Sequence, residues 1–294
     1  MDMETPYSET LHSCNLCAST ALELADPESN IARCASCHYI FDNPRPSLKA
    51  LTGFYSRAAK YDSWLNDLGA RNRLWERRLR KLRSERKPGS LLDVGTGIGQ
   101  FLSLARPLYT AVYGTEISTT AVALAREKYG LNLFQGTIES LLGQEQTFDN
   151  ITLFHVLEHV PDPKMTIEVC HALLSADGIL VIAVPNEIAS LRGRLRALLR
   201  GLGLRQSRYG IPRISLDGSI DEIHLSHFTP DVLRRALEHA GFSVISNTPD
   251  PYFLRTGLRR LKAEAFYFGC VAFQTAFRIN LFDAMFVIAR KVSK

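Results

Sequence analysis

The chain has 294 residues, of which 46% are hydrophobic and 22% charged, a composition that excludes a wholly disordered protein. Its formal net charge of +5 is a mild basic excess, gathered mainly in the arginine-rich stretches 71–87 and 192–213. The first ten residues are polar and acidic, and charged and polar side chains interrupt the most apolar long stretch, 263–288, so neither predicts a secretion signal or a membrane span. We therefore expect a cytoplasmic protein.

The N-terminal region contains two cysteine pairs, Cys14-x-x-Cys17 and Cys34-x-x-Cys37, with 16 residues between them. This spacing predicts a zinc ribbon over residues 10–43, in which four thiolates hold one structural Zn²⁺. The segment is too short and polar to build a core, so the metal would supply its folding energy. A disulfide-linked hairpin and a knuckle that has lost its ion are the alternatives.

Residues 44–88 begin with a proline-rich turn and continue as a helical connector, and in 89–294 short apolar runs alternate with helix-like stretches. The predicted strands are 90–94, 111–115, 131–135, 150–154, 179–184, 242–245 and 284–289. The predicted helices are 98–107, 118–129, 138–143, 163–175 and 228–240, the last capped by Thr229 and ended by Gly241. Strands that alternate with helices pair in parallel, so we expect an α/β fold with a doubly wound, mostly parallel seven-stranded sheet of the Rossmann-like type.

A glycine-rich segment, Asp93-Val-Gly95-Thr-Gly97-Ile-Gly99, follows a predicted strand and precedes a helix. Glycines there let the backbone turn sharply and approach a ligand, although a tight turn without a ligand has the same pattern. About twenty residues on, Glu116 closes the next strand, where a carboxylate can accept hydrogen bonds from ribose hydroxyls. The negative charge of Asp93 disfavours a pyrophosphate and favours a cationic sulfonium nucleoside. The spacing also departs from the G-x-G-x-x-G of dinucleotide-binding oxidoreductases, which remain the rival within this fold.

Several segments occur in the order found in a known family. They are Leu91–Phe101, Gly114–Ser118, Gln135–Glu139, Phe148–Pro163, Leu174–Gly178 and His227–Pro230. On these, residues 89–186 resemble class I S-adenosylmethionine-dependent methyltransferases, and 223–245 resembles the end of that domain. The subgroup that the chain resembles contains ubiquinone-biosynthesis O-methyltransferases and bacterial sugar and natural-product methyltransferases. Sugar methyltransferases of this type often begin with a zinc ribbon.

The resemblance implies S-adenosylmethionine as the cofactor and assigns residues to it. Asp93, Gly95, Gly97 and Gly99 would line the methionine end, Glu116 would hold the ribose, Ile117 and Ile138 would flank the adenine, and Phe154 and His155 would border the site. The chain departs from the family at Thr137, where many relatives have aspartate. Its hydroxyl would have to reach the adenine amino group instead.

The segment His155-x-x-Glu158-His159 follows the fourth predicted strand, and three roles are open for it. A histidine can act as general base on a substrate hydroxyl, the three groups can bind a divalent metal, or His155 can line the cofactor. The alternative is a structural role in orienting the loop. Some ubiquinone-pathway relatives bind metal here through two glutamates and a histidine, and His155 replaces the first glutamate. His224 and His227 form a second acid–base pair, and His155, His159 and His227 are our catalytic candidates.

Two late stretches, 187–222 and 252–281, are longer than plain connections require. The first contains a basic amphipathic helix, 191–204, and the second mixes arginines with many aromatic residues. They predict either a cap over the acceptor pocket or a surface that meets anionic lipid or a lipid- or phosphate-linked acceptor. Nucleic-acid binding is disfavoured, because only Arg33 lies between the cysteine pairs and no basic stripe is present there.

Together these features predict a methyltransferase domain over 89–294 behind the ribbon and connector. We expect methyl transfer to a hydroxyl of a small molecule, a sugar or an isoprenoid- or lipid-linked compound, with nitrogen and carbon acceptors still open. Peripheral contact with the inner face of the membrane would fit the basic helices. The rival functions are a nucleic-acid-associated methyltransferase and a non-catalytic scaffold that binds the cofactor.

Overall fold

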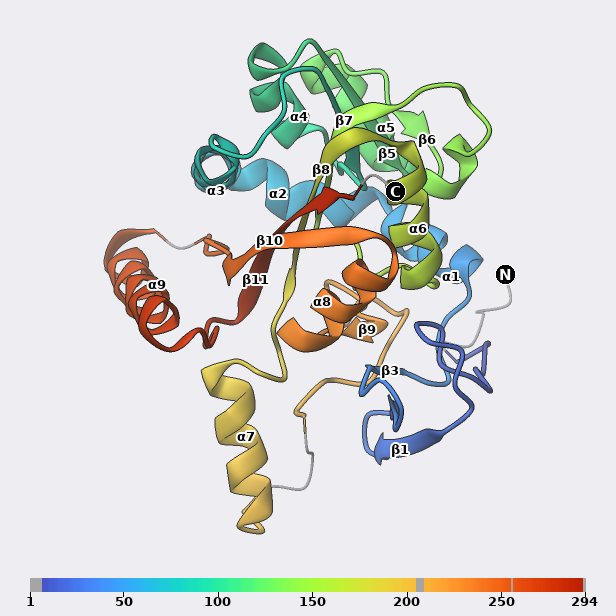
Figure 1. The fold of residues 1–294 in the computed structure, drawn as a ribbon, viewed down its shortest axis with the longest axis vertical. Helices are drawn as coiled ribbons and strands as arrows, with labels where there is room; N and C mark the ends of the chain where they lie inside the picture. The colour runs from blue at the N-terminus through green and yellow to red at the C-terminus, as the bar shows by residue number, and fades with distance from the viewer. Residues whose placement is uncertain (1–6, 205–208, 255, 293–294) are drawn as a thin grey trace.

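The computed structural model describes residues 7–204, 209–254 and 256–292, which form two β-sheets with helices around the larger one (Figure 1). The larger sheet has seven strands in the order β10-β11-β8-β7-β4-β5-β6. They are β4 (Ser90–Val94), β5 (Ala111–Glu116), β6 (Phe134–Gln135), β7 (Phe148–Phe154), β8 (Leu174–Pro185), β10 (Phe242–Pro249) and β11 (Ala284–Lys291). The strands from β8 to β6 are parallel, and β11 runs antiparallel between β8 and β10. This confirms the expected mostly parallel α/β sheet.

Helices cover both faces of this sheet, because successive strand residues point to opposite sides. On one face, Leu92 and Ile151 share a core with α6 (Pro163–Leu173) and α8 (Pro230–His239). On the other face, the neighbouring residue Leu91 packs with α3, α4 and α5. These helices are α3 (Leu68–Leu82), α4 (Gln100–Ala105) and α5 (Thr119–Tyr129). The strand order reverses between β4 and β7, which is where sheets of this kind bind ligands.

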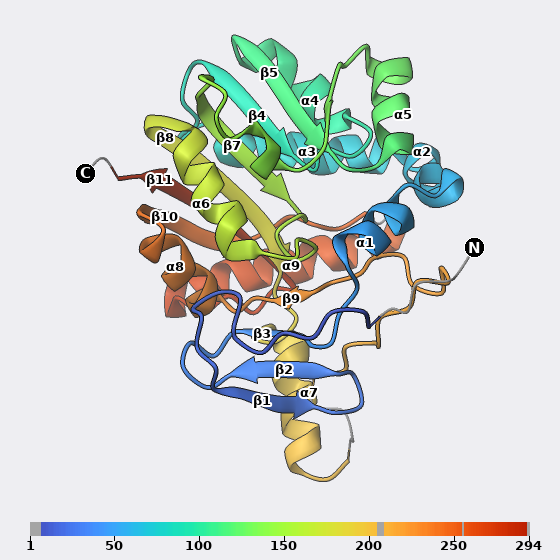
Figure 2. The same cartoon turned by 90° about the vertical axis from the view of Figure 1, so that its right-hand side faces the viewer.

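The smaller sheet is antiparallel and has the order β1-β2-β3-β9. Its first three strands come from the cysteine-containing region: β1 (Leu22–Asp26), β2 (Ile31–Cys34) and β3 (Ile40–Asp42). The fourth, β9 (Ser226–His227), comes from the segment just before α8, and Ile40 pairs with His227. Figure 2 shows this small sheet below the larger one. The ribbon is thus joined by strand pairing to a segment far along the chain.

The remaining elements lie in the connector and in the two late stretches. They are α1 (Leu48–Tyr55), η1 (Ala58–Tyr61), α2 (Asp62–Asn66), η2 (Arg106–Leu108), η3 (Ile138–Leu141), α7 (Leu191–Gly201) and α9 (Gly257–Phe277). Helix α7 projects away from the body of the molecule (Figure 1). Among the described residues, no helix combines the length and apolar character needed to cross a bilayer.

Several elements differ in their bounds from the sequence-based expectation, and the predicted helix 138–143 is the short 3₁₀ turn η3. The third strand is only β6, Phe134–Gln135, because the backbone N–H of Leu131 donates to the Ala125 carbonyl at the end of α5 and not to a neighbouring strand. Helix α6 ends at Leu173 and β8 begins at once, earlier than the predicted 179. The predicted helix 228–240 begins two residues later, with the Thr229 side chain accepting a hydrogen bond from the backbone N–H of Val232 as its cap.

Candidate active site

The turn between β4 and α4 carries the glycine triplet. Gly95 and Gly97 have φ angles of 61° and 59°, a region that residues with side chains rarely adopt. A Cβ atom at Gly95 would lie 2.6 Å from Val156, and one at Gly97 would lie 2.8 Å from the Trp64 ring. The loop therefore requires glycine for its path and for the close approach of its neighbours. Gly99, with φ of 79°, is the N-cap residue of α4.

The carboxylate of Glu116 lies beside this loop, at the end of β5. It accepts hydrogen bonds from the backbone N–H groups of Gly97 at 2.8 Å and Ser118 at 2.9 Å. The side chain is buried, and that burial raises its pKa. A buried carboxylate one strand from the glycine loop can accept hydrogen bonds from the hydroxyls of a nucleoside.

Asp93 lies below the loop in the core of the sheet. Its Oδ1 accepts a hydrogen bond from the Thr152 hydroxyl at 2.6 Å, and burial raises its pKa to about 7. The sequence argument gave Asp93 a direct charge effect on the ligand. In the structure this carboxyl ties β4 to β7 and does not line the neighbouring pocket.

A pocket of about 370 Å³ lies at the carboxyl ends of β4, β5 and β7, within the size range of small-molecule sites. Eight of the predicted site residues line it: Gly95, Gly97, Glu116, Ile117, Thr137, Ile138, His155 and His159. Four do not: Asp93, Gly99, Phe154 and His227. Other lining residues, not singled out from the sequence, come from the connector and from the segment before β9. They include Tyr55, Tyr61, Trp64 and Glu222.

His155 is the first residue after β7, and its backbone φ is 57°. A non-glycine residue in this region is strained, and such strain concentrates at functional sites. Its Nδ1 lies 3.1 Å from Glu158, and its Nε2 lies 3.5 Å from Asp250. Burial disfavours the charged ring, but these bonds to Asp250 and Glu158 outweigh it and raise the pKa of His155. A histidine held between two carboxylates is suited to stay charged rather than to act as a base.

His159, in contrast to His155, is held by its surroundings in the neutral form. Its Nδ1 is 2.6 Å from the carbonyl oxygen of Ile223 and 3.0 Å from the Tyr55 hydroxyl. Because a carbonyl only accepts hydrogen bonds, Nδ1 carries the proton and Nε2 keeps its lone pair. Burial lowers the pKa of His159 despite the nearby carboxylate of Glu158, so the ring is neutral near pH 7. A neutral imidazole on a pocket wall can accept a proton.

The other two histidines belong to a buried network. His227, in β9, lies between Asp42 (Nε2 to Oδ2, 2.9 Å) and Glu187 (Nδ1 to Oε2, 2.7 Å). Burial opposes charge on this ring, but the two carboxylates raise its pKa to about 9. His224 contacts the other oxygen of Glu187 at 3.1 Å, and its Nε2 lies 3.7 Å from Glu222. His227 thus ties the ribbon to the larger domain, away from the pocket.

One group of side chains at the pocket could hold a cation. Glu158, His159 and His224 each place one ligand atom within 4.8 Å of the others. Glu158 Oε2 and His224 Nε2 are buried without a hydrogen-bond partner. The sequence suggested His155, Glu158 and His159 for such a site, and in the structure His224 takes the place of His155.

Arg71 is a candidate binding residue that sequence reasoning missed. Its guanidinium lies 3.6 Å from the centre of the Trp64 ring, and Trp64 lines the pocket. The side chain is buried, which lowers its pKa to about 10, and its Nε has no hydrogen-bond partner. The ion pairs found among the described residues include Arg77 and Arg78 of the same helix, with Glu264 and Asp250, but not Arg71. A buried, unpaired guanidinium beside a pocket is suited to binding a ligand carboxylate.

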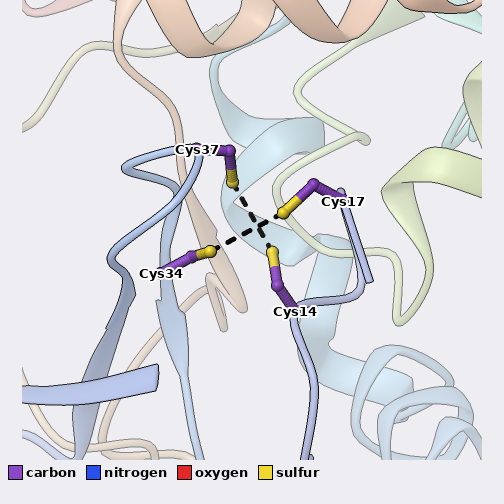
Figure 3. Close-up of side chains that lie close together, drawn as sticks. All are labelled: Cys14, Cys17, Cys34 and Cys37. Carbon is purple, nitrogen blue, oxygen red and sulfur yellow. Dashed lines mark hydrogen bonds between the residues drawn. The ribbon is translucent and has the colours of Figure 1, made fainter. Parts of the chain in front are cut away.

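The four N-terminal cysteines converge on one point, with their sulfur atoms facing one another (Figure 3). The Sγ atoms of Cys14 and Cys37 are 3.7 Å apart, and those of Cys17 and Cys34 are 3.6 Å apart. These distances exclude disulfides, and all four cysteines are free. Tetrahedral Zn²⁺ with Zn–S bonds of about 2.3 Å places its sulfurs about 3.8 Å apart. The four sulfurs therefore fit a zinc ion.

Comparison with known proteins agrees with this geometry. A family described as a methyltransferase domain matches residues 68–247. The ubiquinone biosynthesis O-methyltransferase of Actinobacillus pleuropneumoniae serotype 5b (strain L20) is 38% identical over 108 residues, which cover 33% of this chain and 46% of that protein. Its Coxiella burnetii (strain Dugway 5J108-111) counterpart is 35% identical over 103 residues, covering 33% and 44%. The chain spans less than half the length of these curated relatives.

Solved structures share the fold at low sequence identity. Magnesium protoporphyrin IX methyltransferase from Synechocystis PCC 6803 with bound SAH has a TM-score of 0.53 and 14% identity, covering 83% of this chain and all of that one. An S-adenosylmethionine-dependent methyltransferase from Mesorhizobium loti has a TM-score of 0.50 and 19% identity, covering 72% and 96%.

Fold, pocket and family thus agree that the protein is a methyltransferase. The chain belongs to the methyltransferase domain family and is a class I S-adenosylmethionine-dependent methyltransferase. This confirms the enzyme class and the methyl donor expected from the sequence. The family match disfavours the dinucleotide-binding oxidoreductase.

Proposed function

We propose that the enzyme methylates an oxygen of a small-molecule, sugar or isoprenoid- or lipid-linked acceptor. The observation that carries this proposal is His159 on the pocket wall with its Nδ1 held by the Ile223 carbonyl, which leaves Nε2 able to accept the proton that an oxygen acceptor must lose during methylation. The partial similarity to O-methyltransferases supports it.

The donor half of the pocket is assigned from its lining. Gly95 and Gly97 would let the methionine end approach the backbone, and Glu116 would accept hydrogen bonds from the ribose hydroxyls. Around the adenine we place Ile117, Ile138 and Thr137. The other three residues predicted for the donor site do not line the pocket. Asp93 and Gly99 would shape the glycine loop, and Phe154 packs on Phe101 of α4 with ring centres 4.9 Å apart.

In the acceptor half, His159 would be the catalytic base. S-adenosylmethionine supplies an electrophilic methyl group when bound. The Ile223 carbonyl fixes the His159 tautomer, so Nε2 is the atom that takes the acceptor proton. Glu158, whose Oε1 lies 3.8 Å from Nε2, stabilises the imidazolium that forms. His155 would orient the loop through Glu158 and Asp250, and His227 would act through the buried network and not on the substrate.

The proposal is tested by following a tritiated methyl group from S-adenosylmethionine into separate pools of hydroxylated aromatic compounds, sugars, lipid extracts and nucleic acid. Label in a small-molecule or lipid pool, with the new methyl on oxygen by NMR, is the expected result. Label in nucleic acid would establish the nucleic-acid-associated alternative. S-adenosylhomocysteine binding without transfer to any pool would favour the non-catalytic scaffold.

A second candidate for the group that activates the acceptor is a divalent metal bound by Glu158, His159 and His224. Their ligand atoms lie within 4.8 Å of one another. A metal there would acidify a bound hydroxyl directly. Turnover that is lost in EDTA and restored by a divalent ion that histidine binds well, such as Fe²⁺ or Ni²⁺, while the cysteine-bound zinc is retained, would favour the metal. Turnover that is unaffected by EDTA favours the base.

We also propose that Cys14, Cys17, Cys34 and Cys37 bind one structural Zn²⁺. Four thiolates leave no open position on a tetrahedral ion, so the role is structural. The fit of the sulfur positions supports this. Metal analysis of the purified protein should give one zinc per chain, and a value near zero would refute it.

The exposed helices α7 and α9 suggest peripheral contact with an anionic membrane surface. Helix α7 has exposed leucines along one side at 191, 195, 198 and 202, together with four arginines and no acidic residue. Helix α9 exposes Leu258, Leu261 and Phe268 beside Arg259 and Lys262. Apolar side chains flanked by cations suit anionic headgroups. Co-sedimentation with phosphatidylglycerol vesicles and not with phosphatidylcholine vesicles is expected, and its absence at low salt would refute this contact.

A further inference from the structure

The first cysteine knuckle reaches directly to the pocket wall. The side-chain amide of Asn15, between Cys14 and Cys17, donates a hydrogen bond to the Pro161 carbonyl at 2.8 Å. The buried guanidinium of Arg45 donates to the same carbonyl at 2.6 Å. Pro161 lines the pocket, two residues after His159. One donor from the ribbon, Asn15, and one from the start of the connector, Arg45, therefore hold one carbonyl in the loop that follows β7.

A second connection runs through backbone hydrogen bonds. The N–H of Asp42, at the end of β3, donates to the Leu225 carbonyl at 3.0 Å. The N–H of Leu225 then donates to the Glu158 carbonyl at 2.7 Å, and the N–H of Ser226 donates to the same oxygen at 3.1 Å. Backbone hydrogen bonds thus connect three segments in sequence: the ribbon strand β3, the segment before α8 and the loop at the pocket.

Buried side chains follow the same path. His227 joins Asp42 of the ribbon to Glu187, and Glu187 joins His227 to His224. The His224 ring lies edge-on to His159, with ring centres 5.0 Å apart. This network leads from the third ribbon strand to the histidine that we place beside the acceptor.

The ribbon also shares its apolar core with the larger domain. Tyr39 stacks on Phe41 at 5.2 Å between ring centres and packs against Phe228, next to α8, at 5.5 Å. The Tyr39 hydroxyl is hydrogen-bonded to Ser226. An independently mobile module would expose these aromatic residues, whereas here Tyr39, Phe41 and Phe228 are buried together. Motion of the ribbon must therefore move its neighbours.

We propose that the zinc ribbon is a positioning element of the methyltransferase pocket, and that Arg45 and Asn15 are positioning residues that fix the loop 155–162 through the Pro161 carbonyl. The loop has no helix or strand of its own, so these bonds replace secondary structure in holding it. The inference rests on the proposed zinc site, but it needs neither an identified acceptor nor the proposed base.

The test compares three zinc-loaded variants with the parent chain. Arg45→Gln removes the charged donor, Arg45→Lys keeps a donor, and Arg33→Gln makes the same charge change on a partly exposed ribbon residue whose partners, Glu23 and His38, both lie within the ribbon. Hydrogen exchange followed by mass spectrometry measures the exchange rate of the loop amides. Calorimetry measures the affinity for S-adenosylhomocysteine, and metal analysis measures the zinc content. None of these readouts requires turnover.

In Arg45→Gln we expect exchange of the 155–160 amides to accelerate about tenfold, since a charged hydrogen bond is lost, while peptides from β4 and β8 exchange as in the parent. The affinity for S-adenosylhomocysteine should fall about threefold or more, because the loop lines its pocket. Arg45→Lys should recover most of both effects, and Arg33→Gln should show neither.

Unchanged exchange at 155–160, an equal acceleration throughout the chain, or an unchanged affinity would each overturn the proposal. If Arg45→Gln does not fold, Asn15→Ala removes only one of the two bonds and gives the same comparison with smaller effects. Parent protein that carries no zinc would refute the zinc site separately, and failure of the loop to respond would leave the proposed O-methylation untouched.

Discussion

Glu116 offers the sharpest single test of the donor site. In the unliganded protein its carboxylate accepts hydrogen bonds from the N–H groups of Gly97 and Ser118. Glu116→Gln preserves shape but replaces one acceptor oxygen with an NH₂ group, which then faces an N–H donor. One lost hydrogen bond to a charged acceptor costs about 1.5 to 3 kcal/mol. If a ribose hydroxyl binds to the replaced oxygen, the affinity for S-adenosylhomocysteine should therefore fall roughly tenfold to a hundredfold.

The assay is calorimetric titration with S-adenosylhomocysteine, alongside titration with adenine, which has no ribose. The variant should lose affinity for the first ligand and keep its affinity for the second. A thermal melt of the unliganded variant separates binding from folding, because the lost backbone bond to the same carboxylate should also lower stability by about 1.5 to 3 kcal/mol. Equal affinity of variant and parent for S-adenosylhomocysteine would show that Glu116 does not hold the ribose, and the donor assignment would fail with it.

Three further outcomes are expected. His159→Gln should lower kcat about a hundredfold or more while S-adenosylhomocysteine affinity stays within about twofold, and unchanged turnover would remove His159 as the base. Arg71→Gln should weaken S-adenosylhomocysteine binding about tenfold but leave 5′-methylthioadenosine, which lacks the amino-acid carboxylate, unaffected, and equal losses for both ligands would argue against a carboxylate contact. The pKa of His227, raised to about 9, means that its contribution to stability is complete below pH 6.5 and disappears as the pH rises through 9. Urea unfolding of the parent should therefore show stability falling over that interval more steeply than in His227→Gln, and parallel pH profiles would contradict the network.

Much of the pocket wall that we assign to the donor could be predicted, because its signals in the sequence are local. The glycine triplet, the strand before it and Glu116 at the end of the next strand follow from short-range pattern, and β4 was predicted with its observed bounds. The four cysteines were equally clear from their spacing. Local patterns succeed where adjacent residues alone determine the backbone path.

The rest of the site and the buried network behind it could not be predicted in the same way, because segments far apart in the sequence build them. Nothing local to His227 shows that its neighbour in space is Asp42, 185 residues earlier in the chain. His224 likewise reaches the Glu158–His159 group only through the path of the segment before β9. Arg71 looked like one more cation in an arginine-rich helix, and its burial on Trp64 depends on how the connector folds over the glycine loop.

The pairing of β3 with β9 also has a consequence for how the chain is made. The ribbon leaves the ribosome before the larger domain, yet one edge of β3 has no partner until residues 226–227 have been synthesised. Pairings of such long sequence separation form late and slowly, and an open strand edge is a site for aggregation. A nascent or truncated chain that stops before residue 226 would present that edge to other proteins, so early termination should yield insoluble product even though the two cysteine pairs and the first eight strands are complete.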